Sequence, residues 1–73
     1  MFAGQAWFET RENCKAAAKA VREEFRIPCR SIVVKESGYF TGYVDRYCLI
    51  LPANKVDDRI KDFIRSQEGY SGY

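Results

Sequence analysis

The sequence predicts an α+β fold: a single two-layer domain in the order αββα, with an antiparallel sheet packed against two helices. Two stretches with helical periodicity flank one stretch rich in β-branched residues, and the chain has 73 residues. A chain of this length buries only about 60% of the surface that it exposes when unfolded. It therefore has material for one core, and we expect residues 1–73 to form one domain.

The first helix is predicted from about Arg11 to Arg26. Thr10 can cap its N-terminus, and Pro28 keeps Ile27 out of helical geometry. Its apolar residues form one stripe with the 3.6-residue period of a helix: Cys14, Ala17, Ala18, Val21 and Phe25. This stripe is the face that must pack on the sheet, and residues 1–9 are left as an amino-terminal extension.

Two strands are predicted after this helix, over residues 30–36 and 43–51, because both segments are rich in β-branched and aromatic residues. The SGYFTG loop between them makes the pair a β-hairpin. A variant with three strands, αβββα, follows if residues 39–43 also pair and the chain turns near Asp45.

The second helix is predicted to begin after Asn54, which can cap it. Its apolar residues again have helical spacing: Val56, Ile60, Phe63 and Ile64. Asp57 and Asp58 fall in its first turn, where the helix dipole favours negative charge. Gly69 is a natural stop, so residues 69–73 are expected to be a short tail.

Composition excludes several kinds of function. The chain has no histidine, which excludes histidine-dependent nucleophilic catalysis and histidine-ligated zinc. Its three cysteines lack C-x-x-C spacing and are expected to be free thiols, of which Cys29 is the one to test for reactivity. Because adjacent helical carboxylates diverge, the acidic pairs do not predict a metal or acid–base site. We expect no enzyme activity, no cofactor and no metal.

The start of the chain has no basic region followed by an apolar run, so no signal peptide is expected. The longest apolar run is too short to span a bilayer. We therefore expect a cytoplasmic protein without a membrane partner, located in the host cytoplasm if a phage encodes it.

The first helix carries a row of basic residues beside its apolar stripe, within a sector about 80° wide. We call this row the basic ridge; it comprises Arg11, Lys15, Lys19, Arg22 and Arg26. It can bind nucleic-acid phosphates or an acidic protein surface, or it can be a solvated face that covers apolar neighbours. A net charge of +2 favours the solvated face.

Alternate residues of the second strand face opposite sides of the sheet, Val44 on one side and Tyr43 with Tyr47 on the other. If both helices pack on the Val44 side, the two tyrosines form an exposed aromatic face, which Tyr39 and Phe40 of the loop continue. The alternative is that the amino-terminal extension, with its aromatic residues, crosses that face and completes the core.

A larger pattern spans residues 10–73: a helix ending near Phe25, the strand RSIVVKE, a Ser/Gly/Tyr loop, the strand YVDRYCLIL, and a closing helix followed by GYSGY. This layout resembles a small αββα accessory domain found within large polyvalent proteins of phages and conjugative elements. The resemblance implies a mobile-element origin. Small chains of that origin commonly bind and block a host protein or complex, anti-CRISPR proteins among them.

The sequence therefore predicts a non-enzymatic binding protein, an anti-CRISPR-like inhibitor that blocks a host protein or ribonucleoprotein complex by steric occlusion. The surface from Tyr39 to Tyr47 and the basic ridge would contact the partner. One alternative is a nucleic-acid-binding protein with the ridge on phosphates and the tyrosines on bases. Another is that the aromatic face makes a homodimer, so a monomer and a dimer both remain open.

Overall fold

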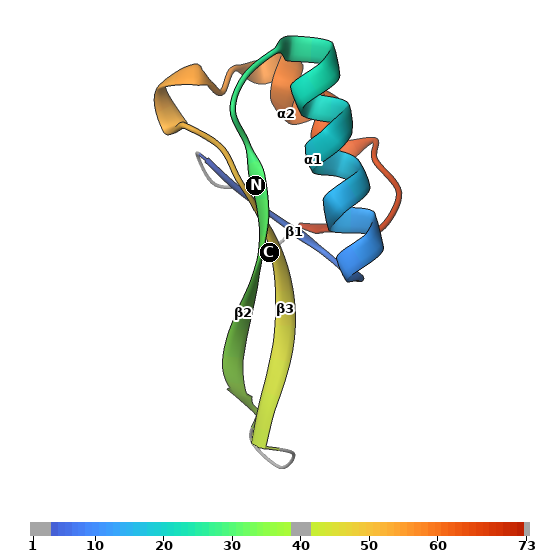
Figure 1. Ribbon diagram of the computed structural model, residues 1–73, viewed down its shortest axis with the longest axis vertical. Helices are drawn as coiled ribbons and strands as arrows, with labels where there is room; N and C mark the ends of the chain where they lie inside the picture. The colour runs from blue at the N-terminus through green and yellow to red at the C-terminus, as the bar shows by residue number, and fades with distance from the viewer. Residues whose placement is uncertain (1–3, 39–41, 73) are drawn as a thin grey trace.

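The computed structural model describes residues 4–38 and 42–72, and its elements follow the order βαββαβ (Figure 1). Two helices and four antiparallel strands give the α+β class that the sequence predicts. The elements are β1 (Gln5–Phe8), α1 (Arg11–Phe25), β2 (Arg30–Gly38), β3 (Gly42–Ile50), a 3₁₀ helix (Ala53–Lys55), α2 (Asp58–Arg65) and β4 (Tyr70–Gly72).

The four strands form one sheet in the order β2-β3-β1-β4, and every neighbouring pair is antiparallel. Consequently β1 runs parallel to β2 with β3 between them, and β3 runs parallel to β4 with β1 between them. Each of these split parallel pairs is connected through one helix. This connectivity is that of the split β-α-β, or ferredoxin-like, arrangement.

The terminal segments differ from the prediction. The order αββα is corrected to βαββαβ, because part of the expected extension (1–9) forms β1 and part of the expected tail (69–73) forms β4. β1 pairs with β3 on one side and with β4 on the other, and both Ala6 and Phe8 are buried. The terminal segments therefore supply the half of the sheet that the predicted hairpin lacks.

The hairpin of β2 and β3 keeps an uninterrupted register from Arg30 opposite Ile50 to Gly38 opposite Gly42. Asp45 lies within β3, so the chain does not turn there and the αβββα variant is wrong. The residues of its expected middle strand include 39–41, which lie outside the described residues.

Both helices pack on the sheet face that carries Ala6, Phe8 and Leu49 (Figure 1). The buried cluster confirms the predicted stripes of both helices, and Phe25 and Phe63 pack at its margin. Those two rings meet edge to face with centroids 5.1 Å apart, which joins α1 to α2. The cluster comprises Ala6, Phe8, Cys14, Ala17, Ala18, Val21, Leu49, Leu51, Ile60 and Ile64.

Helix α1 matches its prediction closely. The hydroxyl of Thr10 accepts a hydrogen bond from the backbone N–H of Asn13 at 3.1 Å, as an N-cap does. The helix ends at Phe25, and Arg26 follows in the left-handed conformation with φ of 55°. Within residues 4–38 and 42–72, neither helix is long and apolar enough to cross a membrane.

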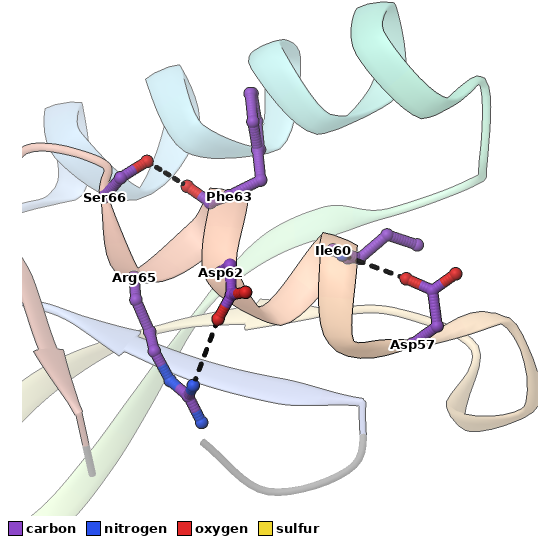
Figure 2. Close-up of polar contacts among 6 residues, drawn as sticks. All are labelled: Asp57, Ile60, Asp62, Phe63, Arg65 and Ser66. Atoms are coloured by element: carbon purple, nitrogen blue, oxygen red, sulfur yellow. Dashed lines mark hydrogen bonds and ion pairs between the residues drawn. The ribbon is translucent and has the colours of Figure 1, made fainter.

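Helix α2 begins later than predicted, because Asp57 rather than Asn54 caps it. The Asp57 carboxylate accepts from the backbone N–H of Ile60 at 3.0 Å, whereas Asn54 lies in the 3₁₀ helix (Figure 2). At the other end, the Ser66 hydroxyl donates to the carbonyl of Phe63 at 2.7 Å. These contacts fix the two ends of a helix of eight residues, which packs against α1 and β4.

The return from α2 to β4 depends on Gly69. Its φ of 79° lies in the left-handed region, and its carbonyl accepts from the backbone N–H of Glu9 at 2.9 Å. A Cβ at this position would also collide with the side chain of Asn13. Gly42 has nearly the same φ, 82°, but a Cβ there would meet no atom of the described residues within 4 Å. Any residue other than glycine is thus strained at both positions and sterically blocked only at Gly69.

We expect Gly42→Ala to lower the free energy of unfolding by about 1 to 2 kcal/mol, the cost of left-handed backbone at a residue with a Cβ. Gly69→Ala should cost about 1 to 3 kcal/mol more, because Asn13 must move. Adding Asn13→Ala to Gly69→Ala should recover most of that difference. Urea denaturation measures all three proteins, and equal losses at the two glycines would contradict the collision.

Candidate partner-binding surface

The hairpin of β2 and β3 projects beyond the rest of the molecule. Each strand has nine residues, but β1 pairs only with the segment of β3 from Tyr47 to Ile50. The outer half of the hairpin is therefore a two-stranded ribbon that extends past both helices (Figure 1). The molecule measures 39 × 22 × 18 Å along its principal axes, and this ribbon accounts for its long dimension.

Large apolar side chains are exposed on this hairpin. Within residues 4–38 and 42–72, the exposed large apolar residues are Tyr43, Val44 and Val33, whose exposed fractions are 75%, 47% and 37%. Tyr43 and Val44 are adjacent in β3, so their side chains lie on opposite faces of the ribbon. Such a ribbon offers apolar contacts on both of its faces.

The two tyrosines predicted to form one exposed face differ in exposure, because the helix layer covers one of them and not the other. They do share a side of β3, as the alternation predicted, but the helices pack on that side and not on the Val44 side. Tyr47 is half-buried and packs against the core, whereas Tyr43 lies on the projecting ribbon. The prediction of an exposed Tyr47 is thus wrong. Tyr39 and Phe40 lie outside the described residues.

Arg46 connects the base of the ribbon to β1. Its guanidinium lies 4.2 Å from the centre of the Trp7 ring, and it pairs with the Glu36 carboxylate at 3.0 Å. The stacking contributes about 0.5 to 1 kcal/mol at an exposed site, more than the exposed ion pair. Because the ring belongs to β1 and the carboxylate to β2, Arg46 holds three strands together where the ribbon leaves the sheet.

All five residues of the basic ridge are exposed, and the structure divides them. Lys15 and Arg22 lie with Arg30 and Ser31 around a groove of about 290 Å³ between α1 and β2. Arg22 also donates a hydrogen bond to the carbonyl of Cys29 at 3.0 Å. Arg30, which the sequence did not single out, borders this groove as the first residue of β2, and its position opposite Ile50 places its side chain on the face of the sheet away from the helices.

The N-terminal end of the ridge has different surroundings. Arg11 lines a second groove, of about 500 Å³, together with Glu9, Glu12, Asp45 and Tyr47. The carboxylates there offset the charge of Arg11. The basic character of the ridge is thus concentrated at the groove between α1 and β2. Lys19 and Arg26 lie outside both grooves.

The three cysteines are free thiols, as predicted, and Cys14 and Cys48 are buried. Burial raises the pKa of all three thiols above the ordinary value. Cys29 lines a pocket of about 320 Å³, and its thiol donates to the carbonyl of Ala18 at 3.2 Å. The positive charge of Arg22 opposes the effect of burial on its pKa without cancelling it. Cys29 is therefore a weak nucleophile near neutral pH.

Among the residues that the structure describes, no three histidine, cysteine or carboxylate side chains gather in a way that could hold a metal ion. The surface with the most distinctive chemistry is therefore the projecting ribbon together with the groove beside α1.

No family model, no curated protein and no solved structure matches this chain. Function is therefore inferred from the residues of the chain itself.

The raised pKa of Cys29 predicts a pH dependence of stability. A group whose pKa is higher in the folded state stabilises the fold fully below its unfolded value, here 9.0, and loses that contribution as pH rises through the folded pKa. The free energy of unfolding should therefore fall above about pH 9. Cys29→Ala should make that fall shallower, because other titrating groups are the same in both proteins. Urea denaturation at pH 8 and pH 10 measures both slopes, and identical slopes would contradict the assignment.

Proposed function

We propose that the protein is a small non-enzymatic binding protein that blocks a host protein complex by inserting its projecting hairpin into that complex. The observation that carries the proposal is the exposure of Tyr43 and Val44 on a two-stranded ribbon that no helix covers. Tyrosine is enriched among the residues that dominate interface energies. An exposed aromatic side chain on a projecting element contributes little to the stability of the fold and much to the affinity for a partner.

The anchoring of the ribbon at its base supports the same function. A two-stranded ribbon alone is marginally stable in water, and ordering it upon binding would reduce affinity. Here the contacts of Arg46 with Trp7 and Glu36 hold the ribbon at its base. Anchoring at the base lowers the cost of ordering the ribbon when it meets the partner.

Steric occlusion fits the shape of the molecule. The compact half of the fold, with both helices, lies at the opposite end of the long axis from the ribbon (Figure 1). If the ribbon enters a recess of the partner, this half covers the entrance. The resemblance to accessory domains of phages and conjugative elements supports a host complex in the cytoplasm as the target.

Replacing Tyr43 with alanine separates binding from stability. We expect Tyr43→Ala to leave the melting temperature nearly unchanged, because a side chain that faces solvent contributes little to the fold. Partner affinity should fall by about 2 kcal/mol, roughly 30-fold, if Tyr43 is an interface anchor. Tyr47→Ala should instead lower the free energy of unfolding, because that ring packs against the core.

The measurement compares tagged wild type and variants as bait in a lysate of the host cell, with captured proteins quantified by mass spectrometry. Arg59→Ala is the control, an exposed position on α2 away from the ribbon. Partners of the ribbon are retained by Arg59→Ala and lost by Tyr43→Ala. Equal capture by all three folded baits would remove the ribbon from the mechanism. A dimer that Tyr43→Ala dissociates would make the ribbon a self-association surface.

A further inference from the structure

Strand β2 is a long edge strand beside a basic surface. It has nine residues, it lies at one end of the sheet order, and within residues 4–38 and 42–72 it pairs only with β3. Its outer side therefore carries backbone N–H and C=O groups without a strand partner in the described part of the chain. An edge of this kind is a template for adding another strand.

Natural edge strands are protected by proline, by bulges, by short length or by charged side chains. The charged residues of β2 are Arg30 at its start and Lys35 and Glu36 toward its outer end, which leaves residues 31–34 uncharged. β2 contains no proline, and its register with β3 runs without a bulge from Arg30 to Gly38. The opposite edge of the sheet, β4, has only three residues. Of the two edges, only β2 is long enough to hold an extended segment of several residues.

Positive charge lines this edge on the helix side. Lys15 and Arg22 of α1 line the groove of about 290 Å³, whose lining includes no acidic residue. Arg30 borders the groove as well, but it lies opposite Ile50 in the register of β2 with β3, so its side chain projects from the other face of the sheet. No ion pair joins either cation of α1 to a carboxylate of the described residues. The hydrogen bond from Arg22 to the carbonyl of Cys29 holds one of the cations in place. The groove therefore presents cations that are free to pair with an anionic ligand.

We propose that β2 binds an extended acidic peptide segment of a partner protein by strand addition, with the carboxylates of that segment in the groove beside α1. Alternate side chains of an added strand repeat about every 7 Å and face the same side. Lys15 and Arg22 lie about 10 Å apart along the helix axis, within reach of carboxylates two or four residues apart on that strand. Backbone hydrogen bonds hold the segment, and the cations select an acidic one.

Two other occupants fit the surface less well. A second copy of the chain pairing through β2 would bring two sets of like charges into one groove, and like charges repel. A nucleic acid would satisfy the cations, but its phosphodiester backbone has no donors for the carbonyl groups of the strand edge. The net charge of +2 is also low for a nucleic-acid-binding domain. The acidic peptide alone satisfies both the edge and the cations.

Fluorescence anisotropy with a labelled peptide of alternating Glu and Thr tests the proposal. We expect saturable binding that the Lys15→Glu/Arg22→Glu double variant weakens at least about tenfold. Arg59→Glu/Lys55→Glu is the matched control, because both residues are exposed, lie outside the groove and give the same change in charge. It should change the affinity by about twofold or less. The same peptide with Lys in place of Glu should not bind.

Strand addition itself is tested on the peptide, so that the protein stays intact. Methylation of alternate backbone nitrogens of the peptide removes hydrogen-bond donors along one edge and should abolish binding when those nitrogens face β2. Amide hydrogen exchange should slow along β2 when the unmodified peptide is bound. Binding that tolerates methylation at either set of nitrogens and leaves exchange unchanged would overturn strand addition.

Three further outcomes would also overturn the proposal: no binding of the acidic peptide, tighter binding of an oligothymidine that the same double variant abolishes, or a dimer of the free protein with protected β2 amides.

The proposal is independent of the one for the ribbon. Tyr43→Ala should bind the acidic peptide as the wild type does, because Tyr43 lies outside the lining of the groove. Either surface can therefore fail its test without the other.

Discussion

Burial of one face of the sheet by two helices is the constraint on which the rest of this structure depends. Leu49 lies on that face in β3 and is fully buried beneath the helices. Small residues of α1, Ala17 and Ala18 among them, allow the helix to lie close to the sheet. In a chain of 73 residues this layer supplies most of the hydrophobic stabilisation.

The helix layer also gives two tyrosines on one side of β3 different surroundings. Tyr43 and Tyr47 are four residues apart on one side of β3, which places them about 13 Å apart. The helix layer reaches Tyr47 and stops before Tyr43. Alternation along the strand could be predicted from the sequence, and it was correct. The side of the sheet that the helices cover could not be predicted, because it depends on where the chain termini join the sheet.

The elements with strong local signals were predictable. Helix α1 has a capping threonine and a continuous apolar stripe, and the hairpin has two runs of β-branched and aromatic residues. Strands β1 and β4 have only four and three residues, too few for a periodic pattern to appear. Their stability comes from pairing with strands distant in sequence. The start of α2 was also not predictable, because Asn54 and Asp57 are both good N-cap residues. The 3₁₀ turn after Pro52 takes up Asn54 and leaves Asp57 as the cap.

The candidate surfaces follow the same division. The basic ridge could be predicted, because it needs only helical geometry. The groove could not, because it forms only when the connection through Pro28 and Cys29 brings the start of β2 beside Lys15 and Arg22. The stacking of Arg46 on Trp7 likewise requires β1 to lie next to β3. Tertiary pairing thus brings cations that are distant in sequence into two defined features, the groove beside α1 and the contact of Arg46 with Trp7.

Both proposed surfaces have one origin, the excess length of β2 and β3 over β1 and β4. Nine-residue strands in a sheet whose other strands have four and three residues must extend beyond it at one end. The part of β2 beside α1 becomes a charged edge, and the part beyond α1 becomes the ribbon. Arg46 clamps the hairpin between these two parts. A partner that offers both an acidic extended segment and an apolar recess would therefore be held at two points along one hairpin, and the second contact would form at the high effective concentration set by the first.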